Sequence, residues 1–93
     1  MEIVNLDIIE SFKRQHSTSR KSLQEWVNKT LIANWATSHD VTKVFPAASF
    51  VKEFVIFNIA GNRYRLLTKI AYDAKKVRVL KAGTHREYDR WKL

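Results

Sequence analysis

The chain has 93 residues, of which 45% are hydrophobic and 12% aromatic, so it can bury one modest core. We therefore expect a single domain spanning residues 1–93. The lack of cysteine excludes disulfides, thiolate catalysis and cysteine-ligated zinc. With no signal peptide and no long apolar run, we expect a cytoplasmic protein that does not span a membrane.

The formal net charge of +8 is concentrated in one half of the chain. Residues 1–49 contain six Lys or Arg against five Asp or Glu, whereas residues 50–93 contain eleven against four. Such a local excess attracts polyanions, and nucleic acid is the leading candidate partner. An anionic membrane, an acidic protein, or a basic surface that serves only solubility are the alternatives.

The first third of the sequence predicts a short strand at residues 1–4 and then two helices. The first helix should begin at a cap formed by Asn5 or Asp7 and end near His16. The second should cover about residues 18–33, since its apolar residues recur at helical spacing. We expect the two helices to form a hairpin whose apolar residues all lie in the core: Ile8, Ile9, Phe12, Leu23, Trp26, Val27 and Leu31.

Residues 34–53 are the least regular part of the sequence. Trp35 should anchor the chain after the second helix. Residues 38–40 resemble a cap for one helical turn, which Pro46 then ends. His39 has no partner at metal-site spacing, so we expect it at the surface.

The pattern changes to strands from Phe54 onward. An apolar run at residues 54–59 predicts a central strand, followed by a tight turn at 60–62 and a long strand at 63–72. A second turn at 73–76 leads to a third strand at 77–81, which Gly83 should end. The predicted fold class is α+β, with an N-terminal strand and a helical hairpin on one face of an antiparallel sheet. We expect the other face to remain open.

The long strand has one cationic face and one apolar face. Alternation places Arg63, Arg65 and Lys69 together on one side. Burying these cations would cost several kcal/mol per ion, so we expect them to point away from the helices. The ordinary alternative is that they form the solvated side of a half-exposed sheet.

His85 and Tyr88 follow the last strand and can move protons. RNA cleavage by the 2′-hydroxyl needs a base, an acid and stabilisation of the phosphorane charge. His85 suits either proton step, and Tyr88 does so if Arg65 or Lys69 lowers its pKa. The guanidinium of Arg65 matches two phosphate oxygens. Otherwise, His85 bonds nearby backbone and Tyr88 packs on the sheet edge. Carboxylates after residue 50 are too scattered to suggest a metal site, and no cofactor is expected.

These motifs resemble the HigB-type toxins of the RelE-like superfamily, which belong to type II toxin–antitoxin systems. The resemblance rests on Gly61, Asn62, Tyr64 and Arg65 together with the Thr84, His85, Glu87, Tyr88 and Asp89 cluster. Upstream, Trp26, Trp35 and the Phe45-Pro46 pair extend it over most of the chain.

The resemblance implies a RelE-like fold and an endoribonuclease, an mRNA interferase that inhibits translation by cleaving mRNA, often on the ribosome. It also implies a cognate helix-turn-helix antitoxin of the HigA type. Arg65 and Lys69 would contact the phosphate, His85 and Tyr88 would transfer protons, and Asp89 would orient His85 or Arg86. The implied RNA contacts are Lys52, Asn62, Arg63 and Arg78. A non-catalytic nucleic-acid-binding module, or an inactive toxin retained as an antitoxin partner, are the alternatives.

Overall fold

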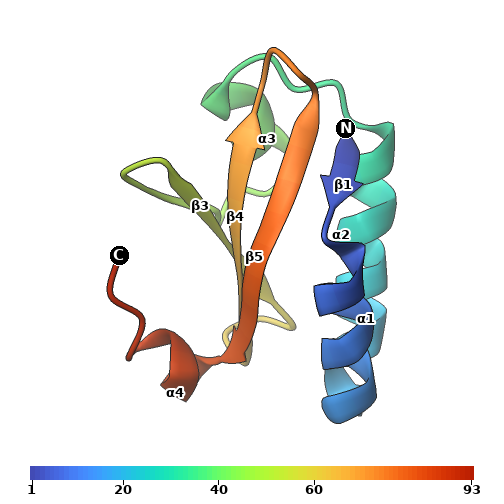
Figure 1. The fold of residues 1–93 in the computed structure, drawn as a ribbon, viewed down its shortest axis with the longest axis vertical. Helices are drawn as coiled ribbons and strands as arrows, with labels where there is room; N and C mark the ends of the chain where they lie inside the picture. Colours follow the sequence, from blue (N-terminus) through green and yellow to red (C-terminus); the bar gives the residue numbers. More distant parts are fainter.

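The computed structural model, which describes residues 1–93, has a helical layer on one side of a five-stranded sheet (Figure 1). The strand order is β1-β5-β4-β3-β2. The strands are β1 (Glu2–Val4), β2 (Ser49–Val51), β3 (Phe54–Ile59), β4 (Tyr64–Ala71) and β5 (Lys76–Thr84). The sheet is mixed, because β1 pairs with β5 in parallel while the other pairs are antiparallel. The α+β class is confirmed, but the sheet is not purely antiparallel.

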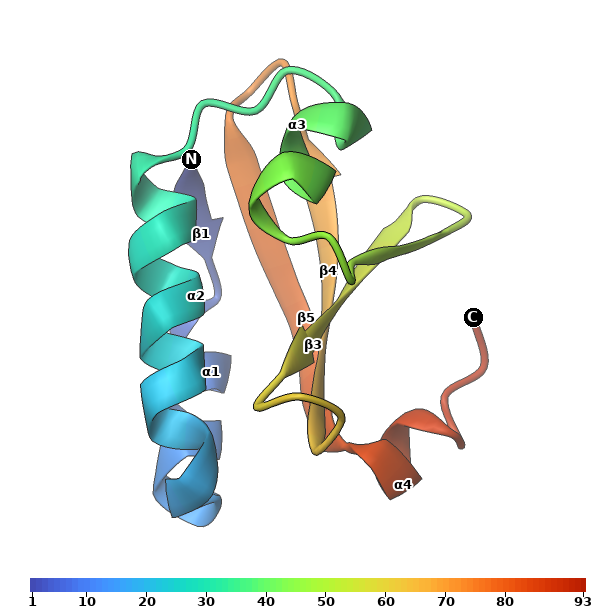
Figure 2. The same cartoon turned by 180° about the vertical axis from the view of Figure 1, so that it is seen from behind.

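Three helices form the layer behind the sheet. The hairpin consists of α1 (Leu6–Gln15) and α2 (Arg20–Ile32), joined by the 3₁₀ turn η1 (Ser17–Ser19), and α3 (Ser38–Val44) lies beside α2 (Figure 2). The short helix α4 (His85–Tyr88) and the C-terminal tail lie on the opposite side of the sheet. No helix has the length and apolar character needed to cross a membrane.

The core lies between the helical layer and one face of the sheet. As predicted, Leu23, Trp26 and Val27 of α2 are buried. Trp26 packs edge-on against Phe57 of β3, with ring centres 5.4 Å apart. Burial of each large apolar side chain of this kind stabilises the fold by roughly 1.5–3 kcal/mol. The expected face of the long strand joins this core, through Tyr64 and Leu66.

Leu31 is not part of the core, contrary to expectation. Its exposed fraction is 53%, whereas Thr30 is fully buried. The buried face of α2 therefore follows the spacing i, i+3, i+4, i+7 from Leu23 to Thr30, which turns Leu31 toward solvent.

Neither of the two predicted helix caps forms as expected. Asn5 occupies the N-cap position of α1 in a left-handed conformation with φ 68°, but its side chain does not cap the helix. Instead, Asn5 Nδ2 donates to the carbonyl oxygen of Val79 at 3.0 Å, which fastens α1 to β5. Thr37 is the N-cap of α3, and Asp40 Oδ2 accepts from the Thr37 backbone N–H at 3.2 Å.

The edge strand β2 was not predicted from the sequence. It has three residues and pairs with β3 across a tight turn, in which Lys52 has a φ of 55°. A strand this short carries too little alternation to be recognised, and its pairing depends on the neighbouring strand.

β5 is longer than predicted because Gly83 lies inside it rather than ending it. A bulge occurs beside the Leu67–Thr68 step of β4: Thr68 pairs with Val79 and Leu67 with Lys81, which leaves Leu80 unmatched. The extra residue shifts the alternation. Lys81 and Gly83 consequently share the outward face, while Ala82 packs against the core.

Candidate functional site

The proposed site residues at the end of the chain are held by a reciprocal cap at the start of α4. The backbone N–H of Glu87 donates to Thr84 Oγ1 at 3.2 Å, and that of Thr84 donates to Glu87 Oε1 at 3.0 Å. This capping box turns the chain from β5 into α4, so His85 and Tyr88 stand at the strand end. The backbone N–H of Thr84 is the main cause of a lowered pKa for Glu87, and desolvation opposes it.

Arg65 lies on the face away from the helices, as predicted, but it is not exposed to solvent. Its exposed fraction is 8%. Arg65 Nη1 donates to the carbonyl oxygens of Asn62 and Tyr64, both at 3.1 Å, and the guanidinium lies 5.3 Å from the centre of the Tyr88 ring. The expectation that the strand's cations all face water is therefore wrong for Arg65, because carbonyls and an aromatic face replace part of its hydration.

No carboxylate pairs with Arg65. The ion pairs of the structure join Lys13 to Glu10, Lys69 to Glu53 and His85 to Asp89. Both hydrogen bonds of Arg65 use Nη1, so Nη2 and Nε have no protein acceptor. A largely dehydrated guanidinium with spare donors and no counter-ion is suited to an anionic oxygen from outside the chain.

The ring of Tyr88 contacts both Arg65 and His85. The ring centres of Tyr88 and His85 are 6.3 Å apart in an edge-on arrangement. On the exposed side, His85 Nδ1 lies 3.3 Å from Asp89 Oδ2. A proton on Nδ1 held toward Asp89 would leave Nε2 available for a substrate. The structure thus brings together Arg65, Tyr88 and His85, with Asp89 beside the imidazole. These four residues are named here the Arg65 cluster.

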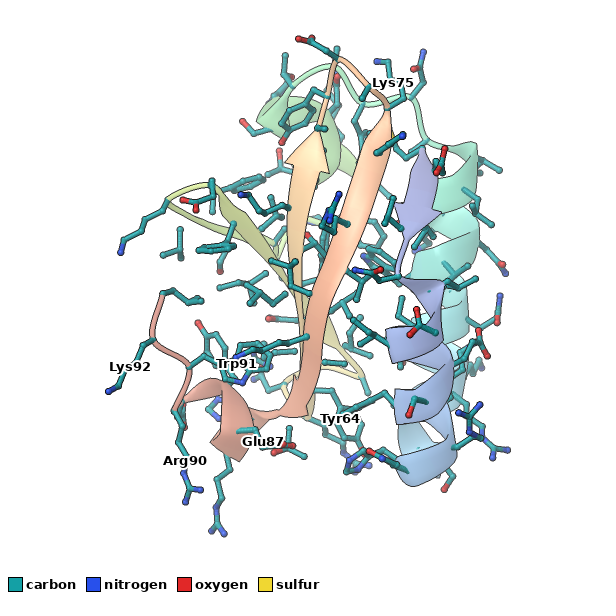
Figure 3. All side chains as sticks on the ribbon, in the orientation of Figure 1. Tyr64, Lys75, Glu87, Arg90, Trp91 and Lys92 are labelled. Atoms are coloured by element: carbon teal, nitrogen blue, oxygen red, sulfur yellow. The ribbon has the colours of Figure 1, made fainter.

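Trp91 completes this cluster and was not predicted as a site residue. Its ring lies 5.6 Å from that of Tyr88 and 5.9 Å from Lys81 Nζ, and Figure 3 shows its side chain between the tail and the sheet. Gly83 makes room for it: a Cβ atom there would stand 2.8 Å from Trp91 Cζ2. The sequence alone hides this contact, because the bulge determines that Gly83 and Lys81 face outward.

We expected the outward face of the sheet to be open along its whole length, but part of this face is buried. Ile56 and Leu67, paired neighbours on β3 and β4, belong to this face but are only 1% and 4% exposed. The tail lies on this side of the sheet (Figure 1). The face therefore has its own small apolar cluster, and Arg65 lies next to it on β4.

Lys69 and Arg78 stand apart from the Arg65 cluster. Four residues separate Lys69 from Arg65 along β4, which corresponds to roughly 13 Å in a strand. Lys69 pairs directly with Arg78, and the two line a groove of about 460 Å³ together with Lys76, which was not predicted. Val4, Ile70 and Leu80 contribute its apolar lining. Lys69 therefore does not lie beside Tyr88, and Arg65 is the cation that contacts the phenol ring.

The remaining predicted RNA contacts lie at the two turns next to β3. Asn62 and Arg63 are exposed in the β3–β4 turn, and the carbonyl of Arg63 accepts from the backbone N–H of His85 at 3.0 Å. This turn therefore borders the Arg65 cluster. Lys52 lies in the β2–β3 turn, where its Nζ donates to the carbonyl oxygen of Leu93 in the tail at 2.8 Å.

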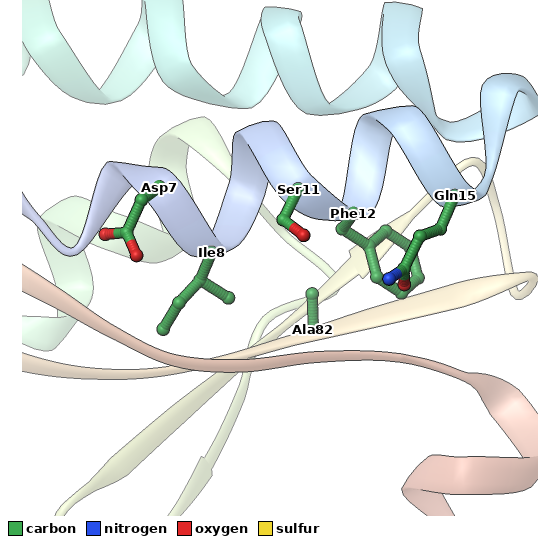
Figure 4. A pocket seen from close by; sticks show the side chains of 6 residues that line it. All are labelled: Asp7, Ile8, Ser11, Phe12, Gln15 and Ala82. Atoms are coloured by element: carbon green, nitrogen blue, oxygen red, sulfur yellow. The ribbon is translucent and has the colours of Figure 1, made fainter.

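A second hollow, between α1 and β5, lacks the groups that catalysis would need. It has a volume of about 310 Å³ and is shown in Figure 4. Its lining is Asp7, Ile8, Ser11, Phe12, Gln15 and Ala82. Asp7 is its one titratable side chain, so it offers no acid–base pair. No group of three or more His, Cys, Asp or Glu residues in the structure is placed to hold a metal ion.

Comparison with protein families places most of the chain in one of them. The family model described as HigB_toxin, the RelE-like toxic component of a toxin-antitoxin system, matches residues 19–91. This range runs from η1 to Trp91, so it includes α2, four of the five strands and the Arg65 cluster. No curated protein matches the chain.

Proposed function

This chain belongs to the HigB family of RelE-like toxic components of toxin–antitoxin systems, and we propose that it is an endoribonuclease that cleaves messenger RNA. The observation that carries the proposal is the convergence of Arg65, Tyr88 and His85 where β5 meets α4. Membership of the family implies an antitoxin partner.

The proposed reaction is attack of a 2′-hydroxyl on the adjacent phosphorus. The 2′-oxygen loses its proton to a base and bonds to phosphorus, while the bond to the 5′-oxygen breaks and that oxygen takes a proton from an acid. The products are a 2′,3′-cyclic phosphate and a 5′-hydroxyl end. His85 and Tyr88 are the two proton-transfer groups, in either order. Arg65 stabilises the charge on the non-bridging oxygens through its free donors.

The other cations of this side of the sheet supply a path for the RNA backbone. The groove between Lys69 and Arg78 begins about 13 Å from Arg65, a distance that spans more than one nucleotide of an extended strand. Asn62 and Arg63 border the Arg65 cluster, and Lys52 flanks the tail. We assign these residues to phosphate contacts that hold the chain in register while Arg65 and its neighbours act on one phosphodiester.

We further propose that the substrate is mRNA under translation on the ribosome, in the cytoplasm, and that the antitoxin is a helix-turn-helix protein of the HigA type. These finer assignments follow from the resemblance of the Gly61–Arg65 and Thr84–Asp89 motifs. The positive surface supports them, since it favours approach to any RNA-rich particle.

Primer extension on a translated message tests the nuclease directly. The wild type should create new 5′ ends, and His85→Ala should reduce cleavage by roughly 10²–10⁴-fold while the fold is unchanged, since His85 is exposed. His39→Ala is the matched control, because His39 is exposed on α3 in the helical layer.

Each outcome of this experiment has a definite meaning. New 5′ ends at the wild-type rate in His85→Ala would remove the imidazole from the mechanism. Salt-sensitive RNA binding by the wild type with no cleaved product would instead identify a non-catalytic binding module. Tight binding to the antitoxin without growth arrest in any host would identify an inactive toxin.

A further inference from the structure

The helical layer has an apolar groove at the end of the molecule away from α4. It lies between the C-terminal end of α2 and α3, has a volume of about 470 Å³, and is named here the α2–α3 groove. Its lining is Lys29, Ile32, Ala33, Asn34, Trp35, Asp40, Lys43 and Val44. Figures 1 and 2 both show α3 and the end of α2 at one end of the long axis and α4 near the other.

Ile32 gives this groove an unusual amount of exposed apolar surface. Its exposed fraction is 87%, and Val44, on the α3 side, is also exposed. Single apolar residues at a surface are ordinary. Here the exposed isoleucine borders a concave apolar floor, an arrangement typical of a surface that binds another chain.

The rim of the groove carries two cations and one carboxylate, so its net charge is positive. Lys29 and Lys43 line it and make no ion pair, and Lys29 Nζ lies 5.8 Å above the ring of Phe45. The carboxylate of Asp40 is occupied locally, because Oδ2 accepts from the backbone N–H groups of Ala36 at 2.9 Å and Thr37 at 3.2 Å. An incoming segment therefore meets two available ammonium groups.

The wall of the groove is formed in part by the buried side chain of Trp35. Trp35 packs edge-on against Phe45, with ring centres 6.0 Å apart. Trp35 therefore gives the groove a rigid aromatic wall against which apolar side chains of a bound chain can pack.

We propose that the α2–α3 groove docks an acidic amphipathic helix of the antitoxin. Apolar side chains of that helix would cover Ile32 and Val44, and its Asp or Glu residues would pair with Lys29 and Lys43. The antitoxin is chosen as the occupant because family membership implies such a partner and because the rim is complementary to an acidic segment. The inference goes beyond the proposed nuclease activity and does not depend on it.

Docking at this position would place antitoxin binding and RNA cleavage on separate surfaces of the protein. The α2–α3 groove and the Arg65 cluster lie on opposite sides of the sheet and near opposite ends of the molecule (Figures 1 and 2). A helix bound in the groove does not itself cover Arg65 or His85. Substitutions in the groove should therefore weaken antitoxin binding without changing the action of the free toxin.

Affinity for the purified antitoxin, measured by isothermal titration calorimetry, is the test. We expect Ile32→Asp to bind at least tenfold more weakly than the wild type, with only a small fall in melting temperature, because the side chain is already in solvent and the new carboxylate stands at the C-terminal end of α2. Leu6→Asp is the matched control, since Leu6 is an exposed apolar residue at the start of α1 outside the groove. Its affinity should equal that of the wild type.

Charge reversal tests the electrostatic half of the proposal. Lys29→Glu combined with Lys43→Glu should weaken binding at least tenfold at low salt and less at high salt, whereas Lys21→Glu, outside the groove on α2, should have no effect.

Wild-type affinity in Ile32→Asp would overturn the proposal. So would self-association of the wild type that Ile32→Asp abolishes while antitoxin binding is kept, because the groove would then belong to a second copy. Both measurements report binding without RNA cleavage. A failed nuclease assay would therefore leave this result standing, and the converse also holds.

Discussion

The guanidinium of Arg65 lies 5.3 Å from the centre of the Tyr88 ring, although the two residues come from different elements, β4 and α4. This contact fixes the end of the chain to the middle of the sheet. It also gives Arg65 two roles, since the same group that could hold a phosphate supports the position of α4. Substitutions at Arg65 should therefore affect both stability and cleavage.

Arg65→Ala should lower the free energy of unfolding by roughly 1–3 kcal/mol, since two hydrogen bonds to carbonyls and a cation–π contact are lost. Arg65→Lys keeps the charge but not the planar set of donors, so cleavage should fall more than stability does. Urea denaturation and primer extension measure the two effects. Arg63→Ala, at the exposed turn, is the control and should change stability by less than about 0.5 kcal/mol. Full cleavage by Arg65→Lys would contradict the proposed clamp.

Gly83→Ala should displace Trp91. The new Cβ would stand 2.8 Å from Trp91 Cζ2 and 3.2 Å from Glu87 Cβ, and overpacking of this kind costs typically about 1–3 kcal/mol. Because the clash involves the indole, Gly83→Ala should cost less in a Trp91→Ala background, so the two changes are coupled. Urea denaturation of the four proteins in this double-mutant cycle gives the coupling. Equal costs of Gly83→Ala in both backgrounds would mean that the tail does not pack against Gly83 in solution.

Lys69 and Arg78 should determine part of the salt dependence of RNA binding. If each contacts one phosphate, the double variant Lys69→Ala with Arg78→Ala should reduce the slope of log affinity against log salt by roughly 1.4. Fluorescence anisotropy with a labelled single-stranded RNA measures the slope. Arg14→Ala with Lys21→Ala, on exposed positions of the helical layer, removes the same charge and should leave the slope nearly unchanged. Equal changes in the two double variants would show that only net charge matters.

The cap of α4 should weaken in acid. The pKa of Glu87 is lowered from 4.5, first by the backbone N–H of Thr84 and then by the Thr84 hydroxyl, His16 and Arg90, against the effect of desolvation. The unfolded chain therefore binds this proton more readily, so the stabilisation is complete above about pH 4.5 and is lost as the pH falls toward the folded pKa.

Glu87→Gln isolates this effect, because the amide can still accept from Thr84 but does not titrate. The difference in unfolding free energy between wild type and Glu87→Gln should shrink as the pH falls below 4.5. A difference that is constant between pH 3 and 7 would contradict the assignment.

The elements with strong periodicity could be predicted from the sequence. The bounds of β3 agree with the apolar run at residues 54–59, and those of β4 differ from the expected strand by one residue at each end. The helical hairpin followed from the spacing of Leu23, Trp26 and Val27. The bulge at Leu80 could not be foreseen, because regular alternation from Val77 and Val79 would place Lys81 in the core. The parallel pairing of β1 with β5 could not be foreseen either, because it depends on the tertiary placement of α1, which directly follows β1.

Part of the candidate site could be foreseen as well. The direction of Arg65 followed from alternation along β4, and the shared position of His85 and Tyr88 from their spacing of three. The burial of Arg65 did not follow, because it depends on backbone carbonyls and on the tail, which no local pattern describes. Trp91 was missed for the same reason. Lys81 was missed because the bulge turns it outward, and Lys76 because the sequence analysis placed it in the turn before β5.

The unmatched Leu80 has a consequence for changes in chain length. Removing this residue alone would let Val79 and Lys81 follow one another in a regular ladder, with every later side chain still on its present side. Loss of Val79 or Lys81 would also remove the bulge, because Leu80 would take the vacated position in the ladder and α4 would stay on its present side. Among homologous chains, a one-residue gap in this strand should therefore fall at the bulge, within residues 79–81.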